Sequence, residues 1–195
     1  MIIVFEQRLI LSVFALPLLI CSCGGFGSVE QGIAIDYDAS AGVVTLILDS
    51  NESGPPQYDV LPPIQVRVPE NPRQMGPAPA AGKLLRVDPG AGTLLIFNAR
   101  DQRFETISYQ VVERTGNIYP DNPRVARGEV PSVDPSRGTI TLYSPESREI
   151  LTVSVPSQYL SLPADTWRFG DEVRYYFKSP GQALRMMNVS RTKVS

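Results

Sequence analysis

The sequence predicts an all-β protein in which two tandem five-stranded small barrels follow a cleaved N-terminal segment. A turn signature with Gly, Asp and Gly at fixed spacing occurs three times, and the residues beside it alternate between apolar and polar. A block of five strand-like segments also recurs in the same order in the two halves of the chain. The 195 residues include 18 prolines and 15 glycines, a composition that suits a β protein rich in turns.

Each copy of the turn signature predicts a β-hairpin. The Asp carboxylate can accept a hydrogen bond from a backbone N–H two residues further on, and the closing Gly can adopt positive φ, where a Cβ would be penalised. The flanking residues favour strands, because Ile140 and Leu142, for example, alternate with Thr139 and Thr141. The three sets are Gly32, Asp38 and Gly42, then Gly82, Asp88 and Gly92, then Gly128, Asp134 and Gly138.

The two halves of the chain match segment by segment. We therefore predict a first barrel at residues 32–99 and a second at 128–191, since closure into a barrel removes exposed strand edges. Residues 100–127 join them and are predicted to hold an extra strand near 104–112 and a linker rich in turn residues. The matching segments are 32–48 and 128–143, 64–69 and 151–156, 85–87 and 173–175, and 93–97 and 182–186.

The N-terminus predicts a cleaved lipoprotein signal peptide. The apolar run Leu9–Ile20 is too short to span a bilayer and has the length of a signal-peptide hydrophobic region. It ends in Ile-Cys-Ser-Cys, which looks like a bacterial lipobox in which Cys23 is lipidated, because small Ser22 precedes it directly and Ile20 lies three residues before it. Cys21 fits poorly, since bulky Ile20 would directly precede it. An ordinary secretory signal with two incidental cysteines is the alternative.

This assignment predicts a signal peptide at residues 1–22 and a lipidated tether at residues 23–31. No Asp follows Cys23, so the lipoprotein rules imply the outer membrane, with the protein facing the periplasm. The short tether would keep the first barrel close to the membrane. Cleavage before Cys23 would also leave the mature chain without a free thiol.

Two resemblances extend this prediction. The spacing of residues 128–189 resembles OB-like small barrels of periplasmic proteins, including copper-chaperone-like ones. The segment Leu162–Arg191 (LPADTWRFGDEVRYYFKSPGQALRMMNVSR), with MGPAPAAG at 75–82, resembles an uncharacterised lipoprotein family from sulphate-reducing bacteria. That family carries a domain of unknown function, so the resemblance implies a cellular location but no mechanism.

The composition argues against catalytic and metal sites. The chain has no His, which removes the usual general base and the commonest metal ligand. Asp36 and Asp38 resemble part of a calcium loop, but Asp38 is better explained as a turn residue. Met186 and Met187 are adjacent on a predicted strand and cannot both face one copper site. We therefore predict no catalytic residue, no metal and no cofactor.

The function predicted from the sequence is a membrane-anchored, non-catalytic binding or scaffold module of the cell envelope with a protein partner. The alternative is a periplasmic ligand-binding protein for a glycan, a metal or another small molecule. The net charge of −2 without a basic patch argues against nucleic acid. The Pro-rich connection at 51–63 is longer than its counterpart at 145–150 and predicts an extended contact segment around Tyr58 and Val60. A rigid loop folded against its own barrel is the other interpretation.

Overall fold

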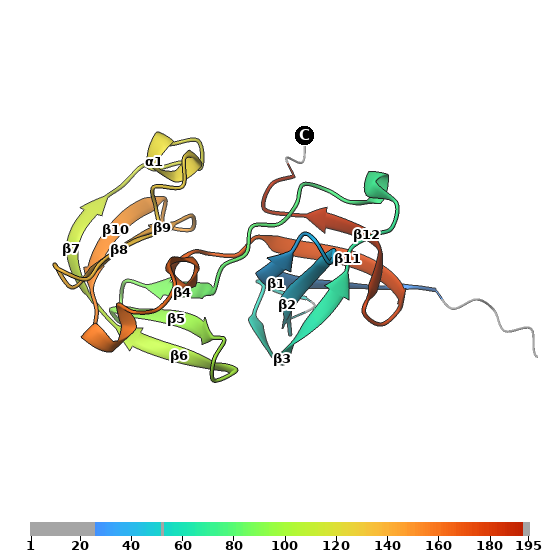
Figure 1. The fold of residues 1–195 in the computed structure, drawn as a ribbon, viewed down its shortest axis with the longest axis horizontal. Coiled ribbons are helices and arrows are strands. Elements are labelled where there is room, and N and C mark those ends of the chain that lie inside the picture. The colour runs from blue at the N-terminus through green and yellow to red at the C-terminus, as the bar shows by residue number, and fades with distance from the viewer. Residues whose placement is uncertain (1–25, 52, 193–195) are drawn as a thin grey trace, which may run out of the picture.

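The computed structural model describes residues 26–51 and 53–192. Within these residues the chain forms strands β1 to β12, three single-turn 3-10 helices and one short α-helix, so the predicted all-β class is confirmed. No helix in this part of the chain is long and apolar enough to cross a membrane. The strands gather into two lobes that lie side by side (Figure 1).

The first lobe combines the beginning and the end of the described chain. Its strand order is β1-β11-β12-β3-β2, and β1 pairs with both β11 and β2. A single parallel pair, Gln182 with Arg67, joins β12 to β3 and completes the circuit of strands. Inside lie Val44, Leu46 and Val66 against Val173 and Tyr175. The strands are β1 (Ser28–Asp38), β2 (Val43–Asp49), β3 (Tyr58–Arg67), β11 (Glu172–Ser179) and β12 (Gln182–Asn188).

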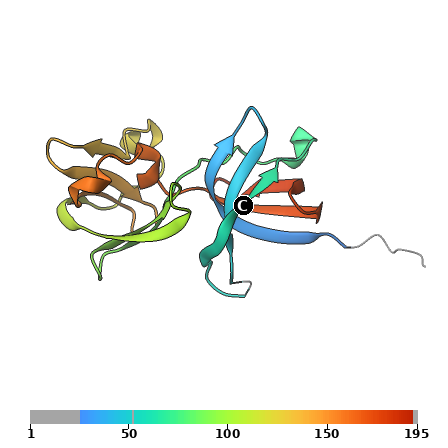
Figure 2. The same ribbon diagram turned by 60° about the horizontal axis from the view of Figure 1, so that its bottom comes forward.

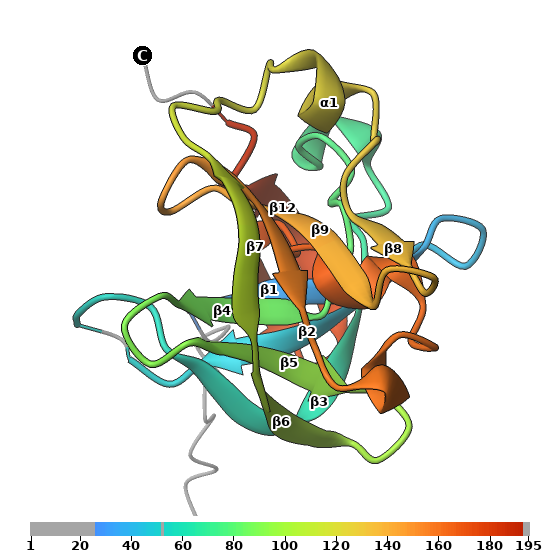
Figure 3. The ribbon, with the colours of Figure 1, turned by 90° about the vertical axis from the view of Figure 1, so that its left-hand side faces the viewer.

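The second lobe lies between β3 and β11 in the sequence and contains two sheets, β4-β5-β6 and β7-β10-β9-β8. Strands β6 and β7 follow one another across Tyr109 and so connect the two sheets (Figure 3). The strands are β4 (Leu84–Asp88), β5 (Thr93–Asn98), β6 (Arg103–Ser108), β7 (Gln110–Thr115), β8 (Ser132–Asp134), β9 (Thr139–Ser144) and β10 (Glu149–Ser154). The helices are η1 (Pro72–Gln74), which follows β3, and α1 (Pro123–Ala126), η2 (Ser157–Tyr159) and η3 (Ala164–Trp167).

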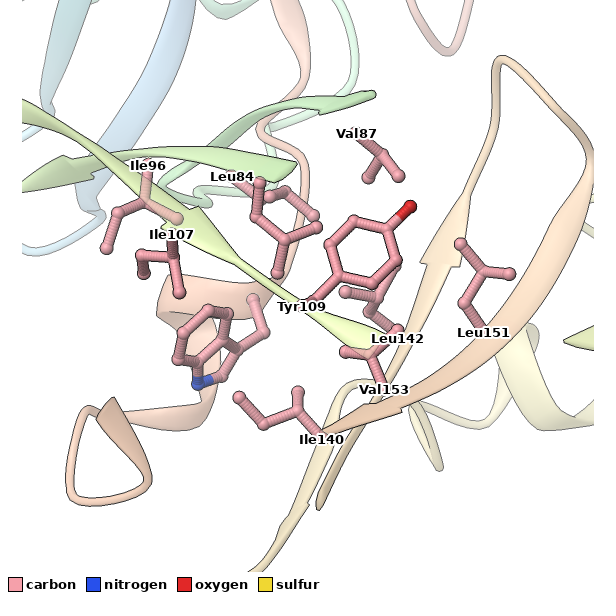
Figure 4. Close-up of a cluster of buried hydrophobic side chains, with 11 residues drawn as sticks. Leu84, Val87, Ile96, Ile107, Tyr109, Ile140, Leu142, Leu151 and Val153 are labelled. Atoms are coloured by element: carbon pink, nitrogen blue, oxygen red, sulfur yellow. The ribbon is translucent and has the colours of Figure 1, made fainter. Parts of the chain in front are cut away.

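Aliphatic side chains from both sheets of the second lobe meet in one core. Leu84 and Ile107 from one sheet face Ile140 and Leu151 from the other (Figure 4). Trp167, at the end of η3, is fully buried in the same core. Burial of apolar surface stabilises the folded state by about 25 cal/mol per Å². This core is therefore a main source of the stability of the lobe.

All three predicted turns form as expected. Asp38 accepts hydrogen bonds from the backbone N–H groups of residues 40 and 41, and Asp88 and Asp134 do the same two and three residues further on. The closing glycines have φ of +62° at Gly42, +65° at Gly92 and +67° at Gly138. The local chemistry of the turn therefore fixes the β1–β2, β4–β5 and β8–β9 hairpins.

The two tandem five-stranded OB-like barrels at 32–99 and 128–191 are not confirmed. Strands form at the expected places, but β4 and β5 pair with β6 in the second lobe, whereas β11 and β12 complete the first lobe. Relative to the prediction, the two halves have exchanged their fourth and fifth strands. The physical reason is that turn chemistry is local, whereas the choice of sheet depends on contacts between distant segments.

Two segments cross between the lobes (Figure 2): residues 76–83 lead from the first lobe to β4, and residues 168–171 lead from the second lobe to β11. They run together: the Asp171 N–H donates to the Ala80 carbonyl (2.8 Å), and the Ala80 N–H donates to Asp171 Oδ2 (2.8 Å). Asp171 also accepts from Asn188 Nδ2 (2.8 Å) and pairs with Arg191 (2.7 Å). A Cβ at Gly170 would lie 2.0 Å from the Ala34 carbonyl oxygen, so only glycine fits where this segment crosses β1.

An apolar cluster packs the two lobes against each other. Ile33 and Ile35 of β1 and Ile47 of β2 turn away from the interior of the first lobe and contact Phe97 of β5. Phe104 of β6 meets the Phe97 ring edge to face, with centroids 6.2 Å apart. Burial of these side chains fixes the orientation of the lobes.

Candidate functional site

The predicted site residues Tyr58 and Val60 lie in the first lobe, and Cys23 is outside the described residues. Tyr58 and Val60 belong to the first half of β3 and pair with Asp49 and Leu48 of β2. They are therefore paired strand residues, and the Pro-rich connection predicted at 51–63 ends earlier than expected, because β3 begins at Tyr58. The preceding connection, described at residues 50, 51 and 53–57, is what lies beside them.

This connection is folded on itself. Asp49 Oδ1 accepts hydrogen bonds from the N–H groups of Asn51 (2.9 Å) and Gln57 (2.7 Å). The Ser50 N–H donates to the Gln57 carbonyl (2.9 Å), and Asn51 Nδ2 donates to the carbonyl of Pro55 (2.9 Å). All of these hydrogen bonds lie within residues 49–57.

Tyr58, the first residue of β3, is partly buried. Its hydroxyl donates to Glu172 Oε2 (2.8 Å), and its ring packs against the cluster between the lobes. Burial, followed by the hydrogen bond to Glu172, raises the pKa of Tyr58 well above its usual value. Tyr58 therefore joins β3 to β11, and Val60, which is 36% exposed, is the predicted contact residue that a partner can reach.

Val60 lines a groove of about 710 Å³, here called the loop groove. One wall is the first part of β1, where residues 28–31 pair with β11 but not with β2. The opposite wall is the folded connection together with the ends of β2 and β3. Its lining comprises Val29, Glu30, Gln31, Leu48, Asp49, Asn51, Gly54, Pro56, Val60, Glu172 and Arg174.

Carboxylates dominate the charge of the loop groove. Glu30, Asp49 and Glu172 face a single cation, Arg174. Glu30 accepts a hydrogen bond from the Tyr175 hydroxyl; burial, then this bond, raises the pKa of Tyr175 above its usual range. Oriented carboxylates beside the apolar surface of Val29 and Val60 suit a partner that carries a Lys or Arg side chain on an extended segment.

The described residues include no group of three His, Cys, Asp or Glu side chains placed to hold a metal ion. The predicted calcium-loop residues Asp36 and Asp38 are not part of such a group. The Asp38 carboxylate accepts hydrogen bonds within its own turn, and a shift in the β1–β2 register lies between Ala34 and Asp36. Met186 is buried in the first-lobe core, and Met187 lies on the outer face.

Residues 25–195 match the family described as a domain of unknown function (DUF4881). The chain belongs to this family. No curated protein and no solved structure matches the chain. The DUF4881 domain covers every strand of both lobes, so the two lobes form one family unit.

A second hollow of the DUF4881 domain lies where the crossing segments meet the second lobe. It has a volume of about 540 Å³ and is lined by both lobes. Tyr143 and Phe169 offer partly buried aromatic rings, and Arg168 and Arg191 offer charged groups. Sequence reasoning did not find this hollow, because its lining comes from segments that are distant in the chain.

The outer face of β11 and β12 is a third surface feature. Arg174, Tyr176 and Lys178 point outward, alternating with Val173, Tyr175 and Phe177, which point into the lobe. The signal was present as a period of two in residues 173–178. This alternation separates outward from inward residues, but the net charge of −2 gives no sign that cations gather on the outward face.

Proposed function

We propose that this protein is a membrane-anchored, non-catalytic binding or scaffold module of the cell envelope that holds a protein partner in the loop groove. The anchor is lipidated Cys23, and the location is the outer membrane, facing the periplasm. Support for the anchor comes from the apolar run Leu9–Ile20 and the lipobox-like end of that run.

The loop groove carries the binding part of the proposal. Its carboxylates are oriented by hydrogen bonds from Tyr58 and Tyr175, so a cationic partner would not have to order them. Val29, Leu48 and Val60 add apolar surface beside these charges. The partner that fits best is an extended protein segment with a basic residue flanked by apolar ones.

Replacement of Val60 by Lys tests the groove. The new cation occupies the acidic groove and repels a basic partner, so recovery of the partner in a cross-linked pull-down of the anchored protein falls at least tenfold. Val112→Lys is the matched control, because Val112 is an exposed strand valine in the second lobe (51% exposed). Equal recovery with both variants would rule out the loop groove as the contact.

The anchor has its own test. Cys23→Ser abolishes lipid labelling and moves the protein out of the membrane fraction, whereas Cys21→Ser leaves both unchanged. Lipid on Cys21, or on neither cysteine, would contradict the assignment.

The hollow between the lobes favours a second candidate, a periplasmic protein that binds a glycan or another small polar molecule. Aromatic rings beside arginines are suited to such ligands. Titration with glycan fragments, followed by NMR, would shift the signals of Arg168 to Asp171 and of Arg191. Shifts confined to the loop groove, or none, would argue against this candidate.

A further inference from the structure

The outer face of β1, β11 and β12 carries two rows of side chains that cross the strands. Val29 lies opposite Tyr176, which lies opposite Arg185, and Gln31 lies opposite Arg174, which lies opposite Met187. A groove of about 520 Å³ runs along these rows. The name basic face is used below for Val29, Arg174, Tyr176, Leu184, Arg185 and Met187.

The arginines of the basic face are oriented by neutral partners. Arg174 donates through Nε (2.9 Å) and Nη2 (2.6 Å) to Gln31 Oε1, and Arg185 Nε donates to Gln74 Oε1 (2.9 Å). Lys178 is the next outward position of β11, and within residues 26–51 and 53–192 no ion pair involves any of the three cations. The groove lining contains no acid. Amide partners fix the guanidinium groups without forming an ion pair. Arg174 also borders the acidic loop groove, whereas Arg185 and Lys178 lie outside that lining, so the positive charge is concentrated on the side of the face away from the loop groove.

Apolar side chains lie among these cations. Val29 is 61% exposed and Leu184 is 44% exposed. The Tyr176 ring lies against the backbone of residue 27, where a Cβ would come within 2.4 Å of it, and the neighbouring Phe26 side chain is fully exposed. Exposed apolar groups beside Arg and Tyr are typical of surfaces that meet the headgroup region of a bilayer.

We propose that the basic face lies on the surface of a bilayer that carries anionic headgroups. This inference rests on the proposed anchor, because a lipid on Cys23 would hold the face at the membrane: the chain from Cys23 to Ser28 spans at most about 18 Å. Headgroup phosphates accept hydrogen bonds from the arginines, and the apolar side chains enter the interface. Each basic residue near such a surface raises the equilibrium constant for membrane contact by about fivefold.

Modification of Lys178 tests the proposal on the whole protein. The chain contains lysine at positions 83, 178 and 193, and Lys83 is partly buried and paired with Asp165. The protein purified from membranes is reconstituted into vesicles of phosphatidylcholine alone or with about one third phosphatidylglycerol, and acylation of Lys178 is followed by mass spectrometry. We expect acylation to be about fivefold slower or more in the anionic vesicles, and to recover at 1 M salt.

Arg174→Gln together with Arg185→Gln restores fast acylation of Lys178 in anionic vesicles. Arg86→Gln with Arg127→Gln is the matched control, because it removes the same charge from exposed positions of the second lobe and leaves the protection intact. An unchanged unfolding midpoint shows that both double variants are folded.

Equal acylation in the two vesicle types would overturn the proposal, as would protection that the Arg174 and Arg185 substitutions do not reduce. Protection by a single-stranded oligonucleotide or an acidic peptide, but not by anionic vesicles, would also overturn it and would assign the face to that ligand. The mass of the purified protein shows whether Cys23 carries lipid, so failure of the anchor is detected separately from failure of the face.

Discussion

The two lobes arrange similar hairpins in different ways. The first lobe is assembled from both ends of the described chain and closes through one parallel pair, Gln182 with Arg67. The second lobe is continuous in sequence and uses an additional strand segment, β6–β7, to connect its sheets. Trp167 then fills its core. Similar hairpins therefore lead to different sheet arrangements, because distant contacts decide which hairpin joins which sheet.

The largest effect that separates the lobes is expected at Trp167. This side chain is fully buried, so Trp167→Ala leaves a large cavity and should lower the free energy of unfolding by about 3–5 kcal/mol. Its Nε1–H has no hydrogen-bond partner within the described chain. Trp167→Phe removes that unpaired group and fills much of the space, so it should cost less than half as much. Chemical denaturation measures both, and equal losses would mean that the indole N–H is satisfied in solution.

Gly170 tests the crossing that exchanges the strands. Gly170→Ala places a Cβ 2.0 Å from the Ala34 carbonyl oxygen, so backbone must move, and the cost should be about 3 kcal/mol. Gly116→Ala is the matched control, because a Cβ there meets nothing within 4 Å. We expect the control to be neutral or slightly stabilising in the same denaturation experiment. A neutral Gly170→Ala would show that the crossing segment is not held against β1.

Substitution of one buried valine in each lobe tests whether the lobes unfold together. Val66 is fully buried in the core of the first lobe, and Val153 is fully buried in the core of the second. Each Val→Ala substitution should cost about 1–3 kcal/mol from transfer and cavity terms. Because the strand exchange links the lobes, we expect both substitutions to shift one shared transition, measured by near-UV and far-UV circular dichroism. Two separate transitions, each sensitive to one valine, would show that the exchange does not couple the lobes.

Local patterns predicted the local structure. The turns at Asp38, Asp88 and Asp134 form where the Gly-Asp-Gly spacing placed them, and the alternating segments became strands. Sheet membership was wrong because the alternation in β4 and β11 says which side of a strand is buried but not against which partner. The same limit applies to the candidate site. Val60 was named from its Pro-rich connection, yet no local signal places the Tyr58 hydroxyl on Glu172.

The smallest expected difference lies in the turns themselves. Asp38 and Asp134 are each followed two residues later by a Ser whose Oγ donates to the carboxylate (2.6 Å), whereas Asp88 is followed by Gly90. At Asp134 the Ser136 hydroxyl is the largest cause of a lowered pKa, followed by the backbone N–H of Arg137. Ser136→Ala should therefore raise the pKa of Asp134 toward its ordinary value of 3.8.

The sign of the pH effect follows from this shift. A carboxyl whose pKa is lower in the folded state adds stability above its unfolded pKa, and this stability is lost as pH falls through the folded value. Ser136→Ala should therefore make folding slightly less dependent on pH below about 4. Carboxyl-carbon NMR titration measures the change at Asp134, and Asp38, which keeps Ser40, serves as the internal control in the same sample. If Asp134 titrated at the same pH in the variant, the Ser136 hydroxyl would have no part in setting its pKa, and the Ser would not distinguish the turns at Asp38 and Asp134 from the turn at Asp88.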